Sequence, residues 1–169
     1  MFSTARKPMG RGAYDLRAMS TEAPDPLERF VLAQEHEYPR ALAELRAGRK
    51  TTHWIWYVLP QLRGLGHSAL AQRYGLAGRA EAETFAAHPL LGPRLVTCVQ
   101  AMLGHPQRSA VQILGAVDAM KFRSCLTLFA EVVPNEPCFR QALDRFYDGT
   151  PDPATLRLLD RTGHEGLQR

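Results

Sequence analysis

The sequence has no apolar run long enough to cross a membrane. A membrane-spanning helix needs about 20 consecutive apolar residues, and the longest candidates, Trp54–Leu59 and Leu126–Ala130, are far shorter. The first residues also lack the apolar stretch of a signal peptide. Their basic residues in an acid-poor stretch would suit a transit peptide, but we favour a disordered extension over residues 1–24. We therefore expect no membrane partner.

Cysteine is scarce. The chain has three cysteines, an odd number, and no Cys-x-x-Cys pair, so neither a disulfide framework nor a zinc site is indicated. Each cysteine lies among apolar residues in a segment expected to be helical, which predicts buried, reduced thiols. Reduced thiols indicate a cytoplasmic location. The six histidines are scattered singly, so we predict no metal site and no other cofactor.

Familiar catalytic and nucleotide-binding motifs are also missing. The chain has no Walker A sequence, no His-x-x-x-His pair and no Gly-x-Ser-x-Gly elbow. The glycines of Gly64-Leu65-Gly66 lack the preceding strand and the remaining glycine of a dinucleotide fingerprint. No motif therefore establishes whether the protein is an enzyme, and nothing in the sequence indicates an oligomeric state.

Excess positive charge is small and unevenly placed. Of the net charge of +4, residues 1–24 supply +2, which leaves too little on the rest of the chain for a strong nucleic-acid binder. Between Leu45 and Val117 the acids are Glu81 and Glu83, against eight basic residues. A positive middle suits a small anionic ligand or an acidic protein partner. It would equally suit ordinary solvated helix faces.

The periodicity that is present is helical. Apolar residues recur at helical spacing through most of the chain, and no strand pattern extends beyond one segment. We therefore expect an all-α protein, a compact single-domain bundle of about seven to nine short helices over residues 25–160. Residues 161–169 are polar, and we expect a frayed C-terminal tail there.

Helix boundaries can be read from capping and breaking residues. Pro39 predicts a division between two helices, and Gly48 the end of the second. Further helices are expected over residues 79–87 and 90–103, separated by His88-Pro89. Helix starts are predicted at the residues Asp25, Ser68, Ser109, Asp118, Asn135 and Asp152.

The segment His53–Gln61 is chemically unusual because it contains two tryptophans and a tyrosine within a few residues. A lone strand would have no partner in a helical chain, so we expect a short, mostly buried helix that ends at Leu59-Pro60. The segment could serve simply as core, since each large aromatic buries about 150–250 Å². Alternatively, its indole and amide groups, with Lys50 and Arg63 nearby, could form the wall of a pocket.

A second polar cluster lies in the segment 118–129. Lys121, Ser124 and Cys125 share a helix face, and Thr127 adjoins Ser124 at i+3. A lysine beside a serine can form a nucleophile pair, but a plain helix surface is the commoner case. We interpret Asp118 as a helix cap rather than a general base.

These two segments together define a candidate ligand site for a nucleotide-like or ADP-ribose-like anion. The candidate residues are His53, Trp54, Trp56, Gln61, Ser68, Lys121, Ser124 and Thr127. The ADP-ribose hypothesis includes hydrolysis only by analogy with other all-helical proteins that process ADP-ribose.

Four segments resemble a known family, namely residues 48–61, 64–68, 88–95 and 121–124. They are similar to the signature of a bacterial family catalogued as domain of unknown function 1810, over roughly Asp25 to Leu159. Members are often labelled calpastatin, but a calpain inhibitor should be disordered and repetitive, so that label looks like a misannotation. The resemblance implies an all-helical cytoplasmic domain without an assigned activity. Family members tend to have two serines and a methionine where this chain has Ser124-Cys125-Leu126.

Two functions therefore stay open at this point. One is the anion-binding pocket. The other is a non-enzymatic interaction module that presents the basic middle of the chain to an acidic protein partner. The second requires Lys50, Arg63 and Arg73 to share an exposed face.

Overall fold

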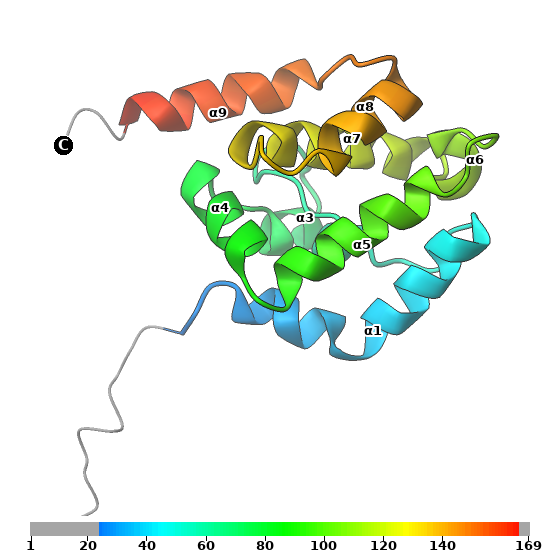
Figure 1. Cartoon of the computed structure of the whole chain (residues 1–169). Helices are drawn as coiled ribbons and strands as arrows, with labels where there is room; N and C mark the ends of the chain where they lie inside the picture. The colour runs from blue at the N-terminus through cyan, green and yellow to red at the C-terminus, as the bar shows by residue number, and fades with distance from the viewer. Residues whose placement is uncertain (1–23, 166–169) are drawn as a thin grey trace, which may run out of the picture.

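The computed structural model describes residues 24–165, so the extension predicted over residues 1–24 falls almost wholly outside the described part. Within that part the chain forms helices and no strand, which confirms the all-α class (Figure 1). One isolated parallel bridge pairs Leu62 with Leu76. The helices are α1 (Glu28–Ala47), α2 (Ile55–Val58), α3 (Ala69–Tyr74), α4 (Arg79–Ala87), α5 (Leu91–Leu103), α6 (Ala110–Leu114), α7 (Ala116–Val132), α8 (Cys138–Tyr147) and α9 (Pro153–Glu165).

Helix α7 forms the centre of the bundle. It packs against α2, α4, α6, α8 and α9, and its residues from Phe122 onward are mostly buried on all sides. An amphipathic surface helix would instead bury a single stripe. Phe129 stacks on Phe139 of α8 with ring centroids 5.5 Å apart, which shows how closely the two helices pack. Polar side chains on α7 therefore lie close to the core.

Several helix boundaries agree with the local sequence signals. Helix α1 ends at Gly48, which adopts a left-handed conformation with φ of 74°. Ser68 caps α3 by accepting a hydrogen bond from the backbone of Ala71 at 3.1 Å. Ser109 forms a reciprocal capping box with Gln112 at the start of α6. Helix α4 spans the predicted residues, and α5 begins one residue later than predicted.

The predicted division at Pro39 is wrong, because α1 continues through it as one helix of 20 residues. Phe30, Gln34, Ala41 and Leu45 lie on its buried face on both sides of the proline. Packing of both halves against α2 and α5 outweighs the lost hydrogen bond. The carbonyl that loses its partner is that of Glu35, and both Glu35 and Pro39 are exposed, so this carbonyl lies on the solvent side of the helix.

Three predicted helix caps are also wrong. Helix α1 begins after Leu27, and Asp25 instead accepts a hydrogen bond from the Leu27 amide at 2.9 Å in the preceding turn. Helix α7 begins at Ala116, directly after Gly115 (φ 86°), so Asp118 lies inside the first turn. Helix α8 begins after Pro137 rather than after Asn135. The residue before a proline is disfavoured in helical geometry, which moves that start along the chain.

Helix α9 is longer than the short helix expected, since it runs to Glu165, and residues 166–169 lie outside the described part. It extends along one side of the bundle beside α7 (Figure 1). Asp152 caps it as predicted, accepting hydrogen bonds from the backbone of Ala154 and Thr155.

The three cysteines are free and buried, as predicted. Burial raises the pKa of Cys98 to about 12, and it raises that of Cys125 well above its ordinary value. Between residues 24 and 165 no helix has the length and apolar character that crossing a bilayer requires.

Candidate functional site

The aromatic segment is attached to the last turns of α1 through one carboxylate, Glu44. Glu44 accepts hydrogen bonds from the backbone of Thr51 (2.5 Å) and Thr52 (2.8 Å), from the Thr52 hydroxyl (2.5 Å) and from the Trp54 indole (3.3 Å). Burial acts to raise the pKa of Glu44, but these four bonds outweigh it and lower the pKa to about 2. The turn before α2 is therefore organised around an ionised Glu44.

Helix α2 is held from two further directions. Gln34, buried on α1, donates a hydrogen bond to the Tyr57 carbonyl at 2.6 Å. The ring of Tyr57 contacts that of Tyr74 on α3, with centroids 5.2 Å apart. These anchors agree with the prediction of a short, mostly buried helix that ends before Pro60.

Asp118 joins the two predicted segments. Its carboxylate forms an ion pair with Lys50 at 2.7 Å and lies 3.9 Å from the ammonium of Lys121. Each lysine lies over an indole ring, Lys50 at 4.9 Å from the Trp54 centroid and Lys121 at 4.8 Å from that of Trp56. The aromatic segment and α7 are thus in direct contact, and Asp118 acts as an ion-pair partner rather than a cap.

A cavity of about 290 Å³ lies next to this contact. It is bounded by the loop before α3, by α7 and by the start of α9, which bring together residues distant in the sequence. Its polar lining residues are Gln61, Lys121, Arg123, Ser124 and Asp152, and its apolar and small ones are Leu65, Gly66, Val117, Met120 and Ala154. The volume is at the lower end of the range for small-molecule sites.

Gln61 is fixed in this cavity by its backbone. The Gln61 carbonyl accepts a hydrogen bond from Leu76 at 3.0 Å, and the Arg63 amide donates to the Leu76 carbonyl at 2.8 Å. This bridge ties together the two ends of the loop that contains α3. The two backbone segments can come this close only because residue 75 is a glycine. A Cβ at Gly75 would lie 2.6 Å from the Cα of Arg63.

Two polar side chains in the lining have unused hydrogen-bonding capacity. Gln61 is only 9 % exposed, yet its side-chain amide makes no hydrogen bond within residues 24–165. The Lys121 ammonium donates no hydrogen bond to the described residues, and its ion pair with Asp118 is long, at 3.9 Å. Both groups face the cavity and are open to water there, so a ligand could replace that water as their hydrogen-bond partner.

A third part of the lining is a hydroxyl–carboxylate cluster. Ser124 donates a hydrogen bond to Asp152 at 2.8 Å, and Thr155 donates its hydroxyl to the same oxygen at 2.6 Å. Burial acts to raise the pKa of Asp152, but these bonds and those from the backbone of α9 outweigh it and lower the pKa. Asp152 is therefore ionised at neutral pH.

Three of the eight predicted site residues line the cavity: Gln61, Lys121 and Ser124. Trp56 lies beneath Lys121, and its indole N–H is buried without a partner in the described chain. Thr127 lies behind the lining, where its hydroxyl donates to the Arg123 carbonyl at 2.8 Å and accepts from the Asp152 amide at 2.8 Å.

The other three predicted residues do not line the cavity. His53 is exposed, Trp54 is sealed in the core with its indole on Glu44, and Ser68 is the cap of α3. Sequence reasoning also missed Asp152 as a lining residue, since its Asp-Pro pattern already had an explanation as a helix cap. One signal could have found it: the Ser124 hydroxyl, buried on α7, requires a partner.

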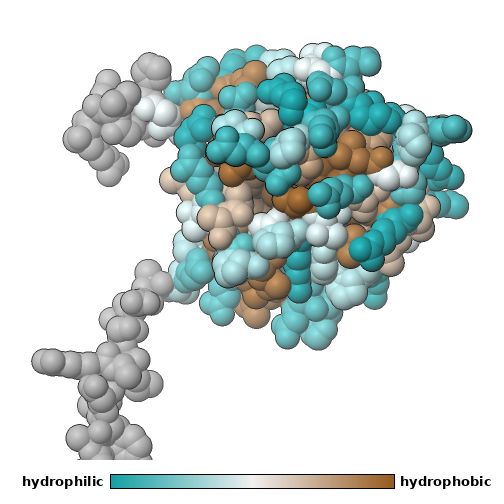
Figure 2. All heavy atoms as spheres, in the orientation of Figure 1, coloured by the Kyte–Doolittle hydropathy of each residue, from teal (hydrophilic) through white to brown (hydrophobic). Residues whose placement is uncertain are grey.

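A second cavity, of about 450 Å³, is mostly apolar and contains none of the candidate residues. It lies among α4, α5 and α8, with Val96 and Phe139 in its lining. Apolar residues are visible among hydrophilic ones on this face of the molecule (Figure 2). No group of three or more metal-ligating side chains occurs in the part of the chain that the structure describes.

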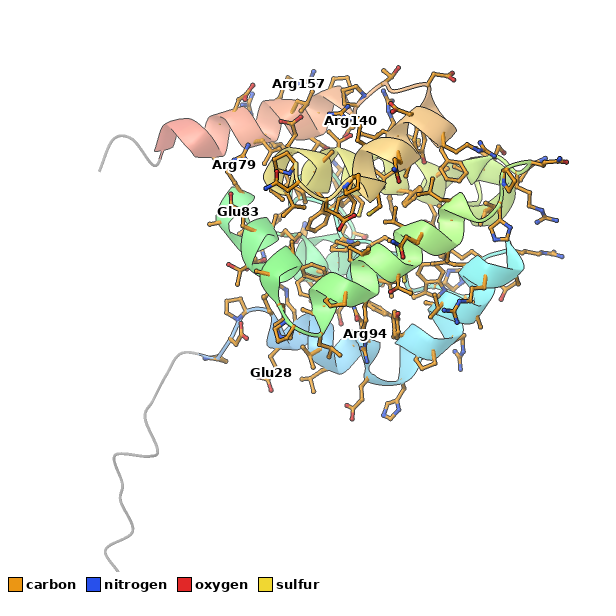
Figure 3. The ribbon with its side chains drawn as sticks, in the orientation of Figure 1. Glu28, Arg79, Glu83, Arg94, Arg140 and Arg157 are labelled. Atoms are coloured by element: carbon orange, nitrogen blue, oxygen red, sulfur yellow. The ribbon has the colours of Figure 1, made fainter. Side chains whose placement is uncertain are left out.

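The basic residues of the middle of the chain are not gathered on one exposed face. Lys50 is only 5 % exposed and is paired with Asp118, whereas Arg63 and Arg73 are exposed. Arg79, at the start of α4, donates a hydrogen bond to the Glu131 carbonyl of α7 at 3.4 Å, and Arg94 points from α5 toward α1 (Figure 3). Lys50 therefore cannot belong to a basic docking surface.

The fold and cavity define an all-helical protein with a small polar site between its central helix, the start of its last helix and the loop before α3. The sequence profile described as "Protein of unknown function (DUF1810)" matches residues 24–159, so the chain belongs to this family. A crystal structure of the conserved hypothetical protein Rv1873 from Mycobacterium tuberculosis is 45% identical, with a TM-score of 0.79. The match covers 80% of this chain and 99% of that one. No curated protein matches the chain.

Proposed function

We propose that the cavity lined by Gln61, Lys121 and Ser124 binds a small anionic ligand of the nucleotide or ADP-ribose type. The observation that carries the proposal is the pair of unused groups, the nearly buried amide of Gln61 and the ammonium of Lys121. A ligand that occupied the cavity would complete the hydrogen bonding of both groups. Both groups are open to water in the free protein, so binding exchanges water for hydrogen bonds to the ligand, and those to a charged group are the stronger ones.

The charges in the lining favour an anion at Lys121. The Arg123 guanidinium is engaged by the carbonyls of Thr150 (2.9 Å) and Pro151 (2.7 Å), so it contributes positive charge without being free to move. Lys121 retains three donors on a flexible stem, and lysine commonly binds phosphate as a point charge. The ammonium lies 4.8 Å from the centroid of the Trp56 ring, and this cation–π contact helps to hold it beside the cavity that Lys121 lines.

The proposal is for binding, without a hydrolytic step. Ser124 donates to Asp152, whose lowered pKa makes it a weak base, and no histidine lines the cavity. An activated serine needs a base able to accept its proton near neutral pH. The geometry therefore supports recognition of the ligand more directly than its cleavage.

Thermal unfolding with ligands at about 1 mM tests the proposal. A ligand with a Kd near 0.1 mM should raise the Tm by about 3–5 °C. The ligands are AMP, ADP and ADP-ribose, with inorganic phosphate for comparison. The shift should disappear in Lys121→Met, which keeps the length of the side chain and removes its charge.

Arg140→Met is the matched control, since Arg140 is exposed on α8 and does not line the cavity (Figure 3). It should retain the shift of the unsubstituted protein. Absence of a shift with every ligand, or an equal shift in Lys121→Met, would overturn the proposal.

A further inference from the structure

The hydrogen bonds of Asp152 are distributed unequally between its two oxygens. Oδ2 accepts from the Ser124 hydroxyl (2.8 Å), the Thr155 hydroxyl (2.6 Å) and the Thr155 amide (3.3 Å). Oδ1 accepts a single long bond, from the Ala154 amide at 3.4 Å. A carboxylate has about four lone-pair sites, so Oδ1 of Asp152, a residue of the cavity lining, can still accept strong hydrogen bonds.

The neighbouring hydroxyls are restricted in direction. Ser124 has one proton, and the ionised carboxylate of Asp152 takes it, so Ser124 can only accept a hydrogen bond from a ligand. Thr127 both donates and accepts within the protein and has no role toward the cavity. This part of the lining therefore contains acceptors, whereas Lys121 can only donate.

Hydrogen-bond acceptors thus lie in one part of the lining and a cationic donor in another. From this arrangement we infer that the ligand is a ribose phosphate in which the sugar hydroxyls donate to Asp152 and Ser124 while the phosphate contacts Lys121. The inference rests on the proposed function and deepens it, because Asp152 becomes a specificity residue for the sugar. An anion without hydroxyl donors would satisfy Lys121 and leave the acceptors of Asp152 and Ser124 unmatched.

The size and rim of the cavity agree with a mononucleotide. A volume of about 290 Å³ suits a sugar phosphate, whereas typical sites for drug-sized ligands extend to about 1,000 Å³. Val117 and Met120 border the cavity, one helical turn apart on α7, and are 66% and 73% exposed. These apolar side chains give a base that protrudes from the cavity a surface to pack on.

Isothermal titration with AMP and its 2′,3′-dideoxy analogue tests the inference, since the two differ only in the sugar hydroxyls. We expect AMP to bind at least tenfold more tightly, because a hydrogen bond to a charged acceptor contributes most to such discrimination. In Asp152→Asn the ratio should fall below about threefold. Asparagine is itself a good N-cap, so α9 should persist, and circular dichroism checks this.

Asp144→Asn, an exposed position on α8, is the matched control and should retain the full ratio. Equal binding of the two nucleotides, both dependent on Lys121, would overturn the inference and leave the proposed function standing. An unchanged ratio in Asp152→Asn would also overturn it. If neither nucleotide binds, the inference fails, and the proposed function fails with it only if ADP and ADP-ribose also give no shift in Tm.

Discussion

Lys50 and Asp118 form an ion pair of 2.7 Å that joins the start of the aromatic segment to the first turn of the central helix. The Lys50 ammonium also donates to the Thr52 carbonyl at 2.6 Å and lies over the Trp54 ring. Its side chain is almost fully buried, so its charge depends on these partners for compensation. The pair therefore supports the contact that places Lys121 over Trp56.

Removing one partner of this pair should destabilise the protein more than removing both. For Asp118→Asn we expect a loss of about 3 kcal/mol in the free energy of unfolding, since the almost fully buried Lys50 then loses its compensating charge. Lys50→Met should cost less, because the Asp118 carboxylate that remains is more exposed and still lies 3.9 Å from Lys121. Urea unfolding of both single variants and the double variant would give the coupling energy. Additive effects of the two substitutions would contradict the expectation.

Stability should decrease on acidification through Glu44. Its pKa is lowered to about 2 in the folded protein from an ordinary value of 4.5. A lowered folded-state pKa contributes stability above about pH 4.5, and this contribution is lost as the pH falls towards 2. Glu44→Gln should flatten the pH dependence in this window in unfolding experiments. Glu83→Gln, at an exposed position on α4 (Figure 3), should leave the dependence unchanged.

The two tryptophans should respond differently to replacement by phenylalanine. Trp54→Phe removes the hydrogen bond to Glu44 and leaves space in a fully buried site, so we expect a loss of about 1–3 kcal/mol. Trp56→Phe removes a buried N–H that has no partner in the described chain. The free energy of unfolding of Trp56→Phe should fall by less than about 1 kcal/mol, or should rise. Comparable losses in chemical denaturation would contradict this difference.

The cysteines should react only when the chain unfolds. Burial raises the pKa of Cys98 and Cys138 to about 12, so their reactive thiolate forms are scarce at pH 8. In alkylation with iodoacetamide followed by mass spectrometry, we expect negligible labelling of native protein over minutes. Labelling of all three sites should follow addition of denaturant. Fast labelling of the native protein would show that these thiols are more accessible than their burial indicates.

Helix boundaries could be predicted where a single local feature decides them. Gly78 and the His88-Pro89 pair delimit α4 because each disfavours helical geometry at its own position. Pro39 has a comparable local effect, but the cost there is offset by packing of α1 against α2 and α5. That packing depends on distant residues, so the local pattern could not reveal it.

The candidate site was only partly predictable for the same reason. Lys121 and Ser124 could be paired from helical spacing, and Gln61 from its place beside the aromatic residues. The partner of Asp118 is Lys50 and that of Ser124 is Asp152, both on other elements of the fold. No periodicity within one helix encodes such distant pairs, and both aspartates also had an acceptable local explanation as helix caps.

The bridge between Leu62 and Leu76 has a consequence for fluctuations near the cavity. It closes the backbone around α3, a short helix that exposes most of its residues. Short exposed helices open at low free energy, whereas buried backbone hydrogen bonds open only with larger parts of the fold. Amide hydrogens of α3 should therefore exchange with solvent well before that of Leu76, whose bond to the Gln61 carbonyl holds this edge of the cavity in place. The loop can fluctuate while the backbone at Gln61 remains still.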